Sequence, residues 1–89
     1  MRKLSALIAG ILLILLIGTA GAFSASVQLF SNEAEAQKHC PADTIVWVNT
    51  PSGVYHFRGE RWYANTKNGA FVCRKEGDAV GYRATRNGQ

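Results

Sequence analysis

This 89-residue chain has two histidines and two cysteines, residue types that bind metals or act as nucleophiles: His39, Cys40, His56 and Cys73. Two cysteines and two histidines are enough ligands for tetrahedral zinc. Structural zinc sites usually draw their ligands in pairs about two to four residues apart. Here His39 and Cys40 are adjacent, and the other two residues stand alone. The spacing therefore favours zinc only weakly, and a structural zinc domain is an alternative hypothesis.

The two cysteines have a simpler use if the chain is exported. In an oxidising compartment, an even number of cysteines in a small domain indicates a disulfide, and two cysteines allow one intramolecular pairing. A Cys40–Cys73 bridge would close a loop of 34 residues. The chain-entropy model gives about 3–4 kcal/mol for such a loop. We predict this disulfide; the alternatives are metal ligation or two free thiols.

Catalytic signatures are lacking. A Cys–His nucleophile pair of Cys73 and His56 would need an activated thiolate, but Cys73 is predicted on an apolar strand face, where thiols are inert. The chain has no glycine-rich phosphate loop, no CxxCH haem motif and no paired carboxylates. We therefore expect no catalytic residues, no enzyme activity and no cofactor.

Aromatic residues are interleaved with basic ones after Trp47. Such surfaces can stack single-stranded nucleic acid or sugars, although a small domain needs most of its rings for the core. The best candidates for ligand binding are Tyr63, Arg58, Arg61 and Lys67, unless the arginines are only solvated loop charges. Residues 23–89 contain eight Lys and Arg and six Asp and Glu. This mild excess suits an anionic polymer or an envelope component better than duplex DNA.

The N-terminal segment determines the compartment. Arg2 and Lys3 precede an uncharged stretch that runs to Asn32 and has a strongly apolar centre. This order, followed by small residues, is typical of a secretory signal peptide. We predict a signal peptide at 1–22 with cleavage after Ala22, and a second small-residue motif would place cleavage after Ala36.

An uncleaved membrane anchor is the alternative. Residues 4–23 are long and apolar enough to span a bilayer, and Arg2 and Lys3 would hold the N-terminus in the cytoplasm. The chain would then touch the membrane only through this segment. Both hypotheses place the C-terminal part outside the cytoplasm, as a secreted or periplasmic protein or as a membrane-anchored one.

The rest of the sequence predicts a single α+β domain, which would position these side chains. Residues 23–39 are poor in large apolar groups and are predicted to form a flexible linker. The domain is predicted over 40–85, with a frayed tail at 86–89. Residues 45–48 and 54–57 are predicted strands joined by a turn at 50–53, followed by a loop at 58–60.

A second hairpin is predicted around Asn68-Gly69, because both residues tolerate positive φ. Its strands would be 61–67 and 70–73, and alternation would put one set of side chains in the core: Trp62, Ala64, Thr66, Phe71 and Cys73. Tyr63 and Lys67 would point away. A short helix is expected over 74–81, ending at Gly81, with Tyr82 as its apolar anchor. The predicted fold is thus a signal helix, a small antiparallel sheet of two hairpins and a C-terminal helix, closed by the disulfide.

A long ordered set of short motifs runs from Val46 to Arg83: Val46-Trp47-Val48-Asn49-Thr50, Ser52-Gly53, Val54-Tyr55-His56, Gly59, Arg61-Trp62-Tyr63, Thr66-Lys67, Asn68-Gly69, Ala79 and Gly81-Tyr82-Arg83. In these residues the chain resembles a small bacterial module found behind signal peptides or at the ends of larger exported proteins. The motifs cover about 38 residues.

This module is remotely similar to the Ada-type metal-binding domain, which implies a compact β-sheet followed by a short helix ending near Gly81-Tyr82-Arg83. The likeness does not transfer the metal site. Where the pattern has cysteines, this chain has Glu60 after the Tyr-His strand and Ala84 after Gly-Tyr-Arg. The hypothesis from the sequence is therefore an exported, non-catalytic binding or scaffold module.

Overall fold

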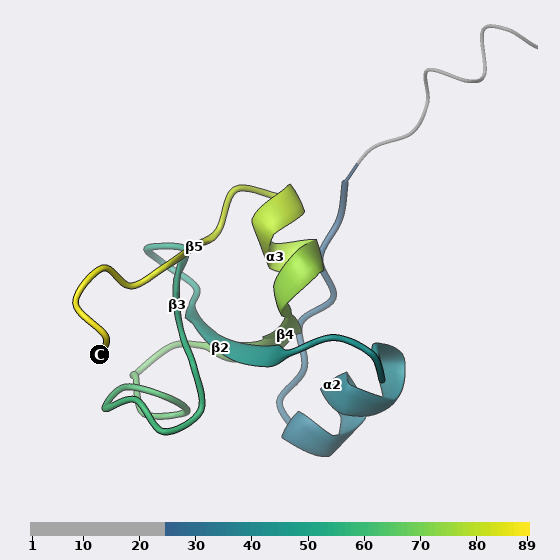
Figure 1. Ribbon diagram of the computed structural model, residues 1–89, viewed down its shortest axis with the longest axis horizontal. Coiled ribbons are helices and arrows are strands. Elements are labelled where there is room, and N and C mark those ends of the chain that lie inside the picture. Colours follow the sequence, from purple (N-terminus) through teal and green to yellow (C-terminus); the bar gives the residue numbers. More distant parts are fainter. Residues whose placement is uncertain (1–24) are drawn as a thin grey trace, which may run out of the picture.

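The computed structural model describes residues 25–89 (Figure 1). The predicted signal helix, its anchor alternative at 4–23 and the cleavage position after Ala22 lie outside the described residues. Within residues 25–89, no helix combines the length and the apolar character needed to cross a membrane.

The described part of the chain is a small α+β unit with a mixed four-stranded sheet. Its elements in chain order are α2 (Glu33–His39), β2 (Ile45–Asn49), β3 (Val54–His56), β4 (Ala70–Cys73), α3 (Arg74–Ala79) and β5 (Arg83–Ala84). The strand order is β4-β2-β3-β5, with β5 parallel to β3 and the other pairs antiparallel. The predicted α+β class is confirmed, although the sheet is mixed because of β5.

The first predicted hairpin is confirmed. β2 pairs with β3 so that Trp47 faces His56 and Val48 faces Tyr55. In the turn between the strands, the amides of Ser52 and Gly53 both donate to the carbonyl of Asn49. Gly53 has a φ of +74°, a conformation that glycine adopts without steric cost.

The second predicted hairpin is wrong. β4 pairs with β2 and places Val72 opposite Val46, whereas residues 57–69 form successive turns instead of a strand. Pairing with β2 buries Val46 and Val72 completely, which a polar strand at 61–67 could not do. The local Asn-Gly signal was therefore outweighed by a long-range apolar pairing.

The C-terminal helix agrees with the prediction and has a regular end. The amide of Tyr82 donates to the carbonyl of Gly77, and the amide of Gly81 donates to that of Asp78. This is a Schellman motif with Gly81 at φ +96°. Gly77 is buried against the Tyr82 ring, and a Cβ there would approach that ring to 3.3 Å. The glycine that weakens the helix thus allows Tyr82 to pack closely.

Each face of the sheet has its own apolar cluster. On the side of α3 lie Val46, Val48, Tyr55, Ala70 and Val72. On the other side Ala36 of α2 packs with Ile45 and Cys73, with Phe30, Cys40 and Phe71 around them. Figure 1 shows α3 and α2 on opposite sides of the β2 ribbon.

The predicted linker at 23–39 is also wrong for its described part. The Asn32 side chain accepts a hydrogen bond from the amide of Glu35 and so caps α2. Phe30 forms a two-way backbone bridge with Phe71 at the edge of β4. Ala36 is fully buried, because its small side chain lets the helix approach the sheet. The folded unit therefore begins before Cys40.

The last residues, predicted to be a frayed tail at 86–89, bond to the rest of the fold. The carbonyl of Gln89 accepts from the amide of Trp62 at 2.9 Å. The Asn87 side chain bonds to Thr85 and Gln89. The C-terminal residues therefore support the loop that contains Trp62.

Candidate functional site

The predicted disulfide between Cys40 and Cys73 is present, with the two Cα atoms 6.3 Å apart. It joins the residue after α2 to the last residue of β4, where α3 begins. Cys73 is fully buried, and Cys40 is partly exposed. The bridge therefore ties α2 to the sheet beside a surface that solvent reaches.

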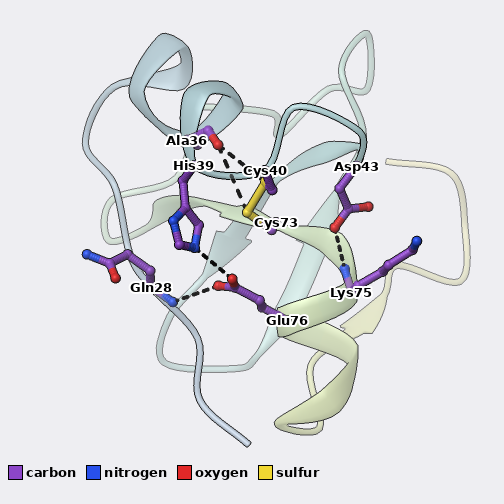
Figure 2. Close-up of polar contacts among 8 residues, drawn as sticks. All are labelled: Gln28, Ala36, His39, Cys40, Asp43, Cys73, Lys75 and Glu76. Carbon is purple, nitrogen blue, oxygen red and sulfur yellow. Dashed lines mark hydrogen bonds and ion pairs between the residues drawn. A yellow bond between two sulfur atoms is a disulfide. The ribbon is translucent and has the colours of Figure 1, made fainter.

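Polar groups surround this bridge (Figure 2). His39 Nε2 lies 2.7 Å from Glu76 Oε2, and Glu76 Oε1 accepts a 3.1 Å hydrogen bond from the amide of Gln28. On the other side, Asp43 Oδ2 accepts from the amide of Lys75 at 2.9 Å at the start of α3. Three separate chain segments thus meet around the sulfur atoms.

The four residues of the zinc alternative do not meet. Within residues 25–89, the ligand atoms of His39, Cys73 and Glu76 lie within 4.8 Å of one another, and so do those of Cys40, Asp43 and Cys73. His56 belongs to neither group and lies on β3, opposite Trp47.

Sequence reasoning missed the two carboxylates near the bridge. Asp43 follows Cys40 by three residues, and Glu76 follows Cys73 by three residues. A carboxylate at this spacing from each cysteine is a signal that could have been read from the chain. Only the tertiary structure, however, places the two cysteine segments together.

The predicted ligand-binding residues belong to one loop at 58–69. Tyr63 does not point away from the core as predicted, since its ring lies 5.8 Å from that of Phe71 and its hydroxyl oxygen is buried without a hydrogen-bond partner. Burial raises the pKa of Tyr63, and the nearby Arg58 charge partly opposes this. The prediction failed because 61–67 turns, with Ala64 at φ 53°, so strand alternation does not apply.

Arg58 already has partners within the fold. Its guanidinium forms an ion pair with Glu33 of α2, and its Cζ atom lies 5.9 Å from the centre of the Tyr63 ring. The Arg58 side chain is nevertheless 71% exposed. Arg58 therefore links the loop to α2 while its outer edge faces solvent.

Arg61 and Trp62 form an exposed aromatic–cation pair. The Arg61 Cζ lies 4.8 Å from the centre of the Trp62 ring, and Trp62 is 36% exposed. The prediction that Trp62 belongs to the core is wrong, because no strand directs it inward. Lys67 is exposed on the same loop.

The loop is held in place by bonds to the sheet and the tail. Trp47 Nε1 donates to Thr66 Oγ1 at 2.8 Å, and that hydroxyl donates to the carbonyl of Asn68 at 2.8 Å. At the other end, Glu60 Oε1 accepts from the amide of Phe57 at 2.7 Å. These hydrogen bonds therefore hold the loop that exposes Trp62.

A shallow depression lies between α2 and this loop. Its volume is about 610 Å³, and it is lined by Glu33, Ala34, Gln37, Lys38, Pro41 and Arg58. The ion-paired Arg58 and Glu33 are among these lining residues, and most of the lining surface is apolar.

No family model matches the chain, and neither a curated protein nor a solved structure matches it. The resemblance to the exported bacterial module and to the Ada-type domain stays a prediction. The function of the chain is therefore argued from the geometry above.

Proposed function

We propose that this protein is an exported, non-catalytic binding module that holds an anionic polymer through the loop at 58–69. The observation that carries the proposal is the exposed Trp62 ring with the Arg61 guanidinium 4.8 Å from its centre. A flat aromatic face and an adjacent cation together suit a polymer that offers both rings and negative charges.

The loop has the properties of a binding loop. It has no regular secondary structure of its own, yet the Trp47–Thr66 hydrogen bond and the bond from Trp62 to Gln89 hold it. Loops fixed on a rigid scaffold often contain binding residues. A ligand that meets a pre-ordered loop loses less conformational entropy from the protein, which favours affinity.

The loop residues have different roles in this proposal. Trp62 and Arg61 contact the polymer, and Lys67 adds a positive charge on the same loop. Tyr63 supports the loop by packing its ring against that of Phe71 in β4. Arg58 is partly neutralised by Glu33, so it contributes to binding only as far as that ion pair opens.

The disulfide supports the proposed compartment. Cysteine bridges persist outside the cytoplasm, and a unit of this size gains much of its stability from one. We therefore place the module in the periplasm or outside the cell, with an envelope polymer as its partner. The predicted anchor at 4–23 would hold it at the membrane surface if the signal stays uncleaved.

Retention on heparin and on single-stranded DNA columns tests the proposal. The full chain should be retained at low ionic strength and released as salt rises, because released counterions drive such binding. Arg61→Ala and Trp62→Ala should elute earlier. Lys75→Ala, which removes one exposed charge from α3, is the matched control and should elute nearly with the wild type. Absence of retention at low ionic strength would exclude the proposal.

The alternative of a zinc domain built on His39, Cys40, His56 and Cys73 has little support from the geometry. The disulfide occupies both sulfur atoms, and His56 is not among the residues around it.

A further inference from the structure

We propose that reduction of the Cys40–Cys73 bridge converts its surroundings into a zinc site with His39, Cys40, Cys73 and Glu76 as ligands. This inference goes beyond the binding module and does not rest on it, because the site lies around the bridge and not on the loop at 58–69. Figure 2 shows the side chains involved.

The donor atoms are already close to coordination spacing. Those of His39, Cys73 and Glu76 lie within 4.8 Å of one another, and Cys40 Sγ is bonded to Cys73 Sγ. Zinc bonds of about 2.0–2.3 Å in a tetrahedron separate ligand atoms by roughly 3.3–3.8 Å. The two sulfur atoms would move apart, and His39 Nε2 would move away from Glu76 Oε2. Both are side-chain adjustments.

Glu76 is a better fourth ligand than Asp43. Both oxygens of Asp43 accept hydrogen bonds from backbone amides, Oδ1 from the adjacent Thr44 at 2.7 Å and Oδ2 from Lys75 of α3 at 2.9 Å. Glu76 uses one oxygen to accept from the amide of Gln28. Its other oxygen contacts His39 Nε2 at 2.7 Å, and because His39 is itself a proposed ligand, zinc would take the place of that contact. The Gln28 contact orients the carboxylate as outer partners do in metal sites.

The site has an opening toward solvent. The side chains of His39 and Glu76 are 38% and 31% exposed, whereas Cys73 is fully buried. An ion would enter from the side of the His39–Glu76 pair and meet the thiolates beneath it. Two thiolates, an imidazole and a carboxylate make a tetrahedral donor set that favours Zn²⁺ over Mg²⁺ or Ca²⁺, which prefer oxygen ligands.

The reduction balances with a dithiol, which gives up two electrons and two protons and becomes a cyclic disulfide, or with a phosphine. The disulfide takes up two electrons and two protons and gives two thiols. A phosphine becomes its oxide, with the oxygen from water, which also supplies the two protons. Binding of Zn²⁺ to both sulfur atoms then releases two protons to solvent. In the oxidised protein both sulfur atoms are bonded to each other and are not thiolate ligands.

Zinc titration of the full chain, oxidised and phosphine-reduced under anaerobic conditions, tests the proposal. A chromogenic chelator reports the affinity, native mass spectrometry reports the zinc content, and Co²⁺ reports thiolate ligation through its charge-transfer absorption. We expect one zinc per reduced chain and at least tenfold weaker binding to the oxidised chain. His39→Gln and Glu76→Gln should each weaken binding to the reduced chain by about tenfold or more, the magnitude that even outer partners reach.

Two control variants separate a built site from simple thiol binding. His56→Gln removes the other histidine, and Glu35→Gln removes a carboxylate from α2. Both should bind zinc like the wild type. Far-UV circular dichroism should show that zinc keeps the reduced chain folded. The proposal is overturned if the oxidised chain binds equally well or if the reduced chain binds none. It also fails if the His39 and Glu76 variants match the wild type, because two thiolates of an unfolded chain would explain that result.

Discussion

Trp47 and Thr66 join the central strand of the sheet to the loop that presents Trp62, through a 2.8 Å hydrogen bond from the indole nitrogen to the hydroxyl. The Cζ2–Cε2–Nε1 edge of the same indole packs on Gly69, where an added Cβ would overlap these atoms. One side chain of β2 thus contacts both Thr66 and Gly69, at the end of the loop that leads into β4.

Gly69→Ala should destabilise the protein by about 1–3 kcal/mol, because the extra methyl group must displace Trp47 or the loop backbone. Urea unfolding measures this change. The cost should fall in a Trp47→Leu background, where the overlap is relieved, and the double-mutant cycle gives the coupling. Equal costs in both backgrounds would contradict the packing described for Gly69.

Glu33→Gln should strengthen binding of an anionic polymer. The substitution removes the charge that partly neutralises Arg58, so Arg58 could contact one more negative group. The slope of log affinity against log salt should steepen by about 0.7 for a single-stranded nucleic acid. Glu35→Gln makes the same charge change on the same helix away from the Arg58 pair. If both variants shift the slope equally, only net charge matters and Arg58 has no specific role.

Tyr63→Phe and Tyr55→Phe should have opposite effects on the free energy of unfolding. The Tyr63 hydroxyl is buried without a partner, so its removal should be neutral or stabilise by up to about 1 kcal/mol. The Tyr55 hydroxyl donates to Asp78 at 2.6 Å and accepts from Arg74. Its loss should cost about 1.5 kcal/mol. Denaturation of both variants in parallel measures this; a costly Tyr63→Phe would point to a bound water or ligand at that hydroxyl.

The protein should become less stable to unfolding as the solution is made alkaline. Burial and, secondarily, the hydrogen bond to Asp78 raise the pKa of Tyr55, and burial raises the pKa of Tyr63, both above the ordinary 10.0. A phenol whose pKa is higher in the folded than in the unfolded protein contributes to the free energy of unfolding. That contribution is complete below the pKa of the unfolded state and is lost as pH rises through the pKa of the folded state. Thermal unfolding followed from pH 8 upward should show the decline above about pH 10. It should be shallower in the Tyr55→Phe/Tyr63→Phe double variant, and an unchanged profile would show that other groups control it.

Cys40→Ala/Cys73→Ala should lower the free energy of unfolding by roughly 3–4 kcal/mol, because the unfolded chain regains the entropy of the closed loop. For a unit this small, that is a large share of the total. Chemical denaturation under oxidising conditions measures it, with the wild type as reference. A change below about 1 kcal/mol would contradict this loop-entropy account.

Local features of the sequence were sufficient to predict several secondary-structure elements. The β-branched run of Ile45–Asn49, the turn at 50–53 and the short helix with Gly81 at its end follow from neighbouring residues, because strand propensity, turn geometry and the Schellman motif are local properties. The cysteine pairing could also be predicted, since two cysteines allow one internal bridge.

Only the tertiary structure decided how these pieces combine. Val72 pairs with Val46 and not with the segment before Asn68-Gly69, because burying two apolar strands outweighs a favourable local turn. The same pairing leaves 58–69 as a loop, which turns Trp62 outward and Tyr63 inward. It also brings Glu76 beside His39 across 37 residues of sequence. Contacts at that separation depend on the packing of α2 and α3 around the disulfide, which no local pattern contains.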